Sequence, residues 1–296
     1  TWLIKPIEND LAQAKGDSTG SQTLLYAPDG ALRYIPLAAL HDGDQWLAER
    51  LQINNITAAS IDDLNNAPAS GDINILAAAF SEGQHQVDVG DRTLSFPGLA
   101  FAGREVENLA KLNPKTETRF NDNFNADIVY EMNDYNIVHL ATHATFASGT
   151  PEDSFILFGD GSRANLNALK RWNIPKVDLI VLSACETAVG DELGSGEEIL
   201  GFGYLMQQAG ADAAIASLWQ VSDGGTQSLM DAFYAALRQG PHQKPRPLQL
   251  AQQALIRNDY SVVGLDRAGI EVVGGNSRQA LVSSGQLNHP YYWAPG

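Results

Sequence analysis

The chain has 296 residues, of which 44% are hydrophobic, with a single cysteine and a formal net charge of −16. One cysteine excludes an internal disulfide framework and a cysteine-based zinc site, and the acidic charge argues against nucleic-acid binding through a basic patch. Because no apolar run reaches the roughly 18 residues of a membrane span and no signal peptide is visible, we expect a cytoplasmic globular protein with no membrane contact.

The first third of the chain predicts a short helix followed by strands. Apolar residues at helical spacing predict a helix within residues 1–15, namely Leu3, Ile4, Ile7 and Leu11. We assign residues 1–20 to the remnant of an upstream helical region and residues 21–296 to one domain. The stretches "TLLYAPDG" and "LQINNITAA" predict two strands, so this domain opens with a β-rich portion that packs beside the main sheet or extends it.

From residue 72 onward, predicted strands alternate with predicted helices. The strands are "DINILAAAF", "TETRF", "NIVHLATHATF", "SFILFGDG", "DLIVLSA" and "ADAAIASLW". The helices are "GLAFAGREVENLAKL", "NADIVYEM", "NLNALKRW", "EEILGFGYLMQQAG" and "TQSLMDAFYAALRQG", with Asn125, Asn165 and Thr226 as expected N-caps. We therefore predict an α/β fold with a mostly parallel central sheet flanked by helices. Residues 259–288 show little periodicity and are typical of an irregular insertion.

Two predicted strands end in residues that can take part in catalysis. His143 ends one strand and Cys185 ends another, and adjacent parallel strands would bring them together at the carboxyl edge of the sheet, where active sites of such sheets lie. A thiol with the ordinary pKa of ~8.5 needs a nearby base to react at neutral pH. His143 can act as that base and then protonate a leaving amine, while the backbone N–H groups of Ala144 and Cys185 are candidate donors to an oxyanion.

The alternative for Cys185 is simple packing, because cysteine is among the most frequently buried residues. The matching histidine and the glycine-rich loop after Cys185 favour chemistry. His139 lies in the same strand as His143, so its ring is expected to be buried and held by a hydrogen bond. The remaining histidines fall in turn-rich segments and are expected at the surface: His41, His85, His242 and His289.

A third strand end, "SLWQVSDGG", contributes candidate substrate-binding residues. Asp223 can pair with an arginine or lysine of a substrate. Equally, Asp223 or Thr226 can cap the next helix. Trp219, Ser183 and Glu186 complete the candidate substrate-binding set.

No motif for a metal or a nucleotide is found, so we expect no cofactor. The stretch "GDGS" at 159–162 predicts a hairpin turn. The glycines of "GFGYLMQQAG" lie inside a predicted helix, which is not the context of a phosphate-binding loop.

Four motifs together resemble the CHAT domain: "HLATHATF", "LIVLSACETAVGDELGSGEEILG", "AAIASLWQVSD" and "HPYYWA". CHAT domains are caspase-like cysteine peptidases often found behind tetratricopeptide repeats in bacteria, especially cyanobacteria. The resemblance covers nearly the whole chain and implies a caspase-type fold related to separases, gingipains and metacaspases. It implies a dyad with His143 as base and Cys185 as nucleophile. Asp223 resembles the separase acid in "LWDVTD" that binds a substrate arginine, although Gln220 and Ser222 replace two residues of that stretch.

The implied function is that of a cysteine endopeptidase, without a cofactor, that cleaves proteins or peptides, with a preference for a basic residue before the scissile bond. The implied partner region is a set of upstream tetratricopeptide repeats. Residues 187–196 match a loop that moves or is cut when caspase relatives are activated. In the family, a closing strand usually follows "HPYYWA". Two alternatives stay open: a catalytically silent interaction or scaffold module, and a thiol hydrolase of small amides or esters.

Overall fold

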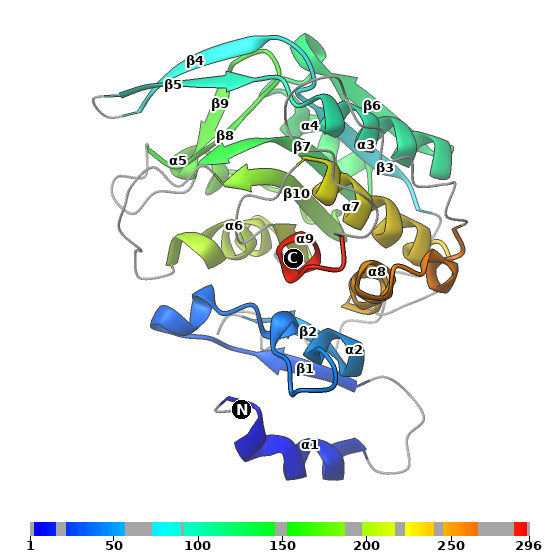
Figure 1. The fold of residues 1–296 in the computed structure, drawn as a ribbon. Coiled ribbons are helices and arrows are strands. Elements are labelled where there is room, and N and C mark those ends of the chain that lie inside the picture. Colours follow the sequence, from blue (N-terminus) through cyan, green and yellow to red (C-terminus); the bar gives the residue numbers. More distant parts are fainter. Residues whose placement is uncertain are drawn as a thin grey trace.

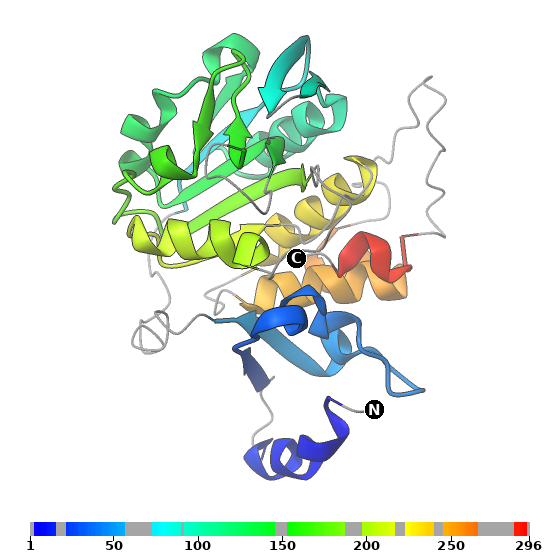
Figure 2. The ribbon, with the colours of Figure 1, turned by 90° about the vertical axis from the view of Figure 1, so that its left-hand side faces the viewer.

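A computed structural model describes residues 3–15, 22–56, 73–89, 92–145, 153–186, 197–216, 223–239, 245–265 and 287–294. Its main body is a central sheet with helices on both faces, and a smaller N-terminal part lies beside it (Figure 1; Figure 2). The predicted α/β class with a mostly parallel sheet is confirmed. None of the helices in these ranges is long and apolar enough to cross a lipid bilayer.

The central sheet places five parallel strands side by side in the order β11-β10-β7-β3-β6. In chain order these strands are β3 (Ile75–Ala79), β6 (Thr116–Phe120), β7 (Ile137–Thr145), β10 (Leu179–Glu186) and β11 (Ala214–Ala216). Every residue of β3 and β7 is buried. The apolar sequence of β3 and the largely apolar sequence of β7 suit this position, because the central strands of a parallel sheet are covered on both faces.

Two short strands extend the sheet in the antiparallel sense beyond the end of β7. They are β8 (Phe155–Leu157), which pairs with β7, and β9 (Arg163–Asn165), which pairs with β8. The turn between them contains Gly161 with φ of +87°, a left-handed conformation that glycine adopts without strain. The hairpin turn predicted for 159–162 is therefore confirmed.

Helices cover the two faces of the central sheet. On one face α3 (Ala100–Leu112) and α7 (Asp223–Leu237) share an apolar core with α8 (Pro245–Arg257) and α9 (Pro290–Trp293). On the other face lie α4 (Ile128–Glu131), α5 (Leu166–Leu169) and α6 (Glu197–Gln208). Short 3-10 turns complete the main body, at Asn121–Asn123, Met132–Asp134 and Tyr260–Val263.

The predicted helix starts are right in one case and wrong in two. Asn165 caps α5, and its side chain accepts a hydrogen bond from the backbone N–H of Ala168. Helix α4 has Asp127 as its N-cap, and Asn125 instead accepts a bond from the N–H of Asp127. Helix α7 begins at Asp223, so Thr226 lies inside it. An acidic residue in the first turn favours this earlier start, because the helix dipole is positive at the N-terminus of a helix.

The N-terminal part contains a separate two-stranded parallel sheet of β1 (Gln22–Tyr26) and β2 (Leu51–Asn55). Around it are 3-10 turns at Lys5–Ile7, Gly30–Tyr34 and Leu37–Ala39, and helices α1 (Glu8–Lys15) and α2 (Leu47–Arg50). Buried Gln249 and Gln253 on α8 both donate to the carbonyl of Ala48 in α2. The β-rich portion thus packs beside the main body and does not extend its sheet (Figure 1).

A two-stranded hairpin links the end of β3 to the start of α3. It consists of β4 (Gln84–Val89) and β5 (Arg92–Pro97), which pair in antiparallel register. His85 lies within β4, half-buried, with Nε2 2.8 Å from the carbonyl oxygen of Gly159, so its expected place in a surface turn is wrong. The alternating pattern that buries Val87 and Val89 explains why this stretch is a strand. The hairpin ends at Pro97, close to the end of β7.

Candidate active site

The ends of β7 and β10 lie side by side at the carboxyl edge of the sheet. These two strands are parallel neighbours, and their register pairs Cys185 with His143 and Glu186 with Ala144. Adjacent strands in a sheet are about 4.8 Å apart. The backbone therefore brings the position of the only cysteine next to that of His143, although the side chains of Cys185 and Glu186 lie outside the described ones.

His143 is held in one orientation by a backbone carbonyl. Its side chain is buried, with 7% of the residue exposed, and Nε2 lies 2.7 Å from the oxygen of Pro97. A carbonyl oxygen only accepts hydrogen bonds, so Nε2 must carry the hydrogen and the neutral ring has its lone pair on Nδ1. Nδ1 is buried and has no hydrogen-bond partner within the described part of the chain. The fold thus presents Nδ1 as the atom able to accept a proton.

The surroundings of His143 favour its neutral form. Burial lowers the pKa of this imidazole below its usual value, and the hydrogen bond to Pro97 raises it by less. Two aromatic rings line the site: the ring centroids of Phe96 and Phe80 lie 5.2 Å and 6.0 Å from that of His143. An imidazole that is neutral at pH 7 can act as a general base.

A buried polar network lies farther back on the face that α3 and α7 cover. Glu105 of α3 accepts a hydrogen bond from Ser183 of β10 at 3.1 Å through Oε2. Its Oε1 lies 2.9 Å from Nε2 of His139 of β7, a contact that is not aligned as a hydrogen bond. Nδ1 of His139 in turn lies 2.9 Å from the hydroxyl of Tyr234 on α7. All four residues are buried. Through Ser183 and His139, the carboxyl group of Glu105 contacts both strands that end at the candidate site.

A second buried acid, Asp231, adjoins this network on α7. Its Oδ2 accepts hydrogen bonds from Asn108 at 3.1 Å and from Gln227 at 3.3 Å. Burial and the nearby negative charge of Glu105 raise the pKa of Asp231 to about 7, because both disfavour the ionised form. Asp231 therefore changes charge near neutral pH.

The predicted site residues have different outcomes. His139 is buried and bonded to Tyr234, as expected. Ser183 does not suit the substrate-binding role expected of it, because its hydroxyl is buried and donated to Glu105. Asp223 is the first residue of α7, and its side chain lies outside the described ones. Four predictions lie wholly or mostly outside the described residues: Trp219, His242, the loop 187–196 and the irregular insertion at 259–288.

Sequence reasoning did not find Pro97, Glu105, Asp231 or Tyr234. Glu105 had a detectable signal, since it lies among the buried residues Ala102, Val106 and Leu109 on the inner face of α3. The buried residues Gln227, Asp231 and Tyr234 also follow a helical spacing, four and then three residues apart. The role of Pro97 had no sequence signal, because it depends on a backbone oxygen and on how the hairpin folds back.

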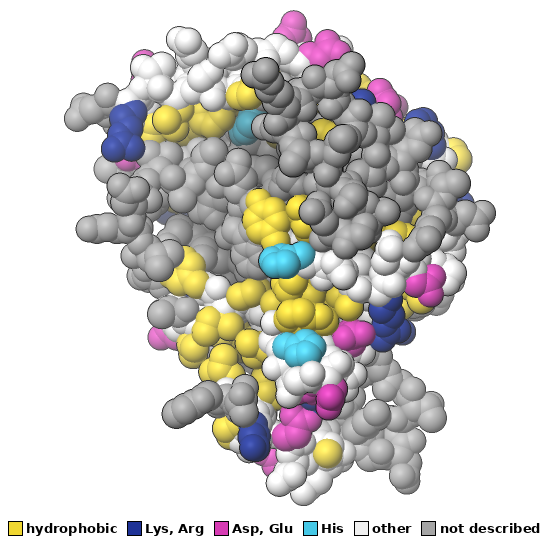
Figure 3. All heavy atoms as spheres, viewed as in Figure 1, with side chains coloured by type: hydrophobic (Ala, Val, Ile, Leu, Met, Phe, Trp, Pro, Cys, Tyr) yellow, Lys and Arg dark blue, Asp and Glu magenta, His cyan; other side chains and the backbone are white. Residues whose placement is uncertain are grey.

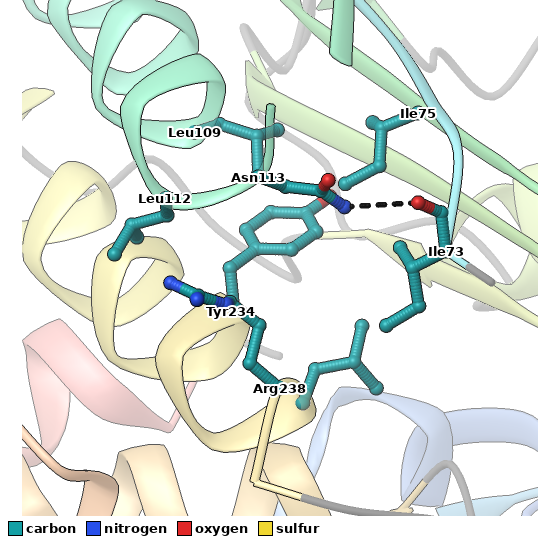
Figure 4. Close-up of a pocket in the computed structure, with 8 residues that line it drawn as sticks. Ile73, Ile75, Leu109, Leu112, Asn113, Tyr234 and Arg238 are labelled. Carbon is teal, nitrogen blue, oxygen red and sulfur yellow. Dashed lines mark hydrogen bonds between the residues drawn. The ribbon is translucent and has the colours of Figure 1, made fainter. Parts of the chain in front are cut away.

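A small cavity lies between α3 and α7 near the opposite edge of the sheet. Its volume is about 10 Å³, and Ile73, Leu109, Tyr234 and Arg238 are among the residues that line it. Figure 4 shows the Tyr234 ring against the space, beside the hydrogen bond from Asn113 to the carbonyl of Ile73. This volume suits about one water molecule. Because Ile75 of the lining begins β3, the cavity lies at the amino ends of the strands, away from His143.

Within the described ranges, no group of three His, Cys, Asp or Glu residues is arranged to hold a metal ion. Figure 3 shows acidic side chains scattered along the face seen in Figure 1, together with hydrophobic ones over the N-terminal part. Leu25 and Leu32 are among the exposed hydrophobic residues of that part.

The comparisons with known proteins agree on a peptidase-like fold. The family model of the CHAT domain matches residues 1–295. The crystal structure of the Arg-specific cysteine proteinase gingipain R is similar in fold, with a TM-score of 0.50 and 12% sequence identity. The match covers 88% of this chain and 65% of the gingipain chain. No curated protein matches the sequence.

Proposed function

Because the chain belongs to the CHAT domain family, a caspase-like cysteine peptidase family, we propose that it is a cysteine endopeptidase with His143 and Cys185 as its catalytic dyad. Two features of His143 carry this proposal. Its Nδ1 is buried and has no hydrogen-bond partner in the described part of the chain, and the residue is in direct register with Cys185, the only cysteine. A base beside a thiol is the requirement for a reactive cysteine at neutral pH. Proteins or peptides are the proposed substrates, and residues 1–20 remain assigned to an upstream helical region.

The proposed reaction is acyl transfer in two steps. Nδ1 of His143 takes the proton of the Cys185 thiol, and the sulfur attacks the carbonyl carbon of a peptide bond. Backbone N–H groups at Ala144 and Cys185 stabilise the oxyanion. The carbon–nitrogen bond then breaks while Nδ1–H protonates the leaving amine. Water, deprotonated by Nδ1, hydrolyses the thioester, which releases the new carboxyl end and restores the thiol.

The pH dependence of peptide hydrolysis tests this proposal. Because burial lowers the pKa of His143, the base form is present above a midpoint that lies below the ordinary value of about 6.5. We expect a fluorogenic peptide, chosen from a cleavage library, to be hydrolysed at a rate that rises with pH through such a midpoint and is maximal by pH 7. Alkylation of the only cysteine with iodoacetamide should abolish hydrolysis. Unchanged hydrolysis after alkylation, or hydrolysis of simple esters but of no peptide, would contradict the proposal.

A preference for arginine or lysine before the scissile bond is the proposed specificity, with Asp223 as the acid that binds it. A hydrogen bond to a charged group contributes about 1.5–3 kcal/mol, so Asp223→Asn should lower kcat/KM for arginine peptides by roughly 10- to 100-fold. Peptides with a neutral residue at that position should change little. The control is Asp127→Asn, an exposed acid at the start of α4. An equal loss for both kinds of peptide would show that Asp223 only begins α7.

A further inference from the structure

One buried carboxyl group joins the two strands that carry the proposed dyad. Glu105 lies on α3 with 3% of the residue exposed. Its two oxygens contact different strands: Oε2 accepts the hydroxyl hydrogen of Ser183 on β10, and Oε1 lies 2.9 Å from His139 on β7. The carboxyl group therefore fixes β7 and β10 relative to each other from a third element.

The contacts lie a short distance behind the proposed catalytic residues. Ser183 precedes Cys185 by two residues, and His139 precedes His143 by four, along strands that are in register from Leu179 to Glu186. A strand rises about 3.3 Å per residue, so Ser183 lies roughly 7 Å from the nucleophile along the backbone. A shift of β10 against β7 at Ser183 would be transmitted directly to the pairing of Cys185 with His143.

Helix α7 is bound to the same cluster. The hydroxyl of Tyr234 lies 2.9 Å from Nδ1 of His139, and the ring centroids of these residues are 5.5 Å apart in an edge-to-face arrangement. Asp223, the proposed specificity residue, begins this helix. The cluster therefore connects the strands of both dyad residues to the helix that begins with the substrate-binding acid.

The chemistry of the cluster favours a role in geometry over one in stability. Burying a carboxyl group costs more free energy than burying an apolar side chain of similar size, even when partners compensate part of that cost. A directed hydrogen bond, unlike an apolar contact, is satisfied only within a narrow range of distance and angle. The bond from Ser183 to Glu105 therefore restricts the offset between the strands more tightly than packing alone.

We propose that Glu105 is a positioning residue for the dyad: by contacting Ser183 and His139 together, it sets the offset of β10 against β7 that places the Cys185 thiol at Nδ1 of His143. This inference rests on the proposed function, since it assigns Glu105 to the same site. The contacts described for Glu105 are with Ser183 and His139 and not with Nδ1 of His143. Glu105 acts through the two strands.

Ser183→Ala and Glu105→Ala test the proposal. Two readouts are needed: kcat and KM for the fluorogenic peptide, and the rate of iodoacetamide alkylation of the single cysteine between pH 5 and 9. Because a misplacement of about 1 Å can cost roughly 100-fold in rate, we expect kcat to fall by about 10- to 100-fold with KM changed by less than about 3-fold. The midpoint of alkylation should move towards the ordinary thiol value of about 8.5. Glu105→Gln, which keeps an oxygen able to accept from Ser183, should recover most of the kcat lost in Glu105→Ala.

Two controls separate the outcomes. Ser228→Ala removes another buried serine hydroxyl, on α7 and not on β7 or β10, and should leave kcat and the alkylation midpoint unchanged. His143→Ala should shift the alkylation midpoint strongly. Suppose that Ser183→Ala and Glu105→Ala melt at a lower temperature but keep the wild-type kcat and alkylation midpoint, whereas His143→Ala shifts the alkylation midpoint. Glu105 is then only structural, and the inference is wrong. If His143→Ala also leaves the midpoint unchanged, the dyad itself is wrong and both proposals fail.

Discussion

Cys185→Ala should reduce peptide hydrolysis by roughly 10⁴-fold or more, because removal of the nucleophile leaves only substrate binding and oxyanion stabilisation. His143→Ala should reduce it by about 10²- to 10⁴-fold, the usual contribution of a general acid–base group. Both losses should appear in kcat for the fluorogenic peptide. Because the two residues act as one unit, the double variant should be little worse than Cys185→Ala alone.

A matched histidine variant shows whether the loss is specific. His289 is exposed, and its Nδ1 accepts a hydrogen bond from the N–H of Tyr291 at the start of α9. His289→Asn retains a residue that caps helices well, so its activity should equal that of the wild type. Melting temperatures measured in parallel show that the variants are folded. A His143→Ala variant with wild-type kcat would mean that the thiol reacts without this base and that the assignment of Nδ1 is wrong.

Asp231→Asn should remove a large part of the pH dependence of stability. The pKa of Asp231 is raised to about 7 in the folded chain, whereas an unfolded aspartate titrates near 4. The folded state therefore keeps its proton to a higher pH, and the wild-type chain loses stability as the pH rises from about 4 to about 7. One pKa unit corresponds to about 1.4 kcal/mol, so above pH 7 the free energy of unfolding is lower by on the order of 4 kcal/mol than at pH values below 4.

Thermal unfolding at pH 5 and pH 8 measures this effect. Asparagine has an oxygen that can accept the hydrogen bonds from Asn108 and Gln227, and it carries no charge at either pH. We expect Asp231→Asn to gain melting temperature over the wild type at pH 8 and to gain less at pH 5. The surface variant Asp127→Asn controls for a general change in net charge. An equal difference between Asp231→Asn and the wild type at both pH values would contradict the raised pKa.

The sequence predicted the parts of the site that depend on local pattern. A mostly apolar segment predicted β7 and a fully apolar one predicted β10, and the residues that end these strands were the candidate dyad positions, which the register pairs. The N-cap of α5 was also predictable, because the side chain of Asn165 bonds a backbone group only three residues away.

What escaped prediction depends on contacts between residues far apart in the chain. Ser183 had the small size of a residue beside a substrate, but its partner Glu105 comes from a helix 78 positions earlier, so its burial could not be anticipated. His85 was assigned to a turn-rich segment, although the alternation of Val87 and Val89 favours a strand. Thr226 was expected to cap α7, whereas the helix begins earlier, at Asp223, and includes the two glycines that follow it.

The acceptor that orients His143 is a main-chain oxygen, and this has a practical consequence for mutagenesis. Substituting the side chain at position 97 leaves a carbonyl in place, so an alanine scan would pass over a group that determines which ring nitrogen is basic. Insertion or deletion of a residue within β5, between Arg92 and Pro97, would instead shift the pairing of β5 with β4 and displace that carbonyl. The imidazole tautomer thus depends on the register of a hairpin and not on the identity of any one of its amino acids.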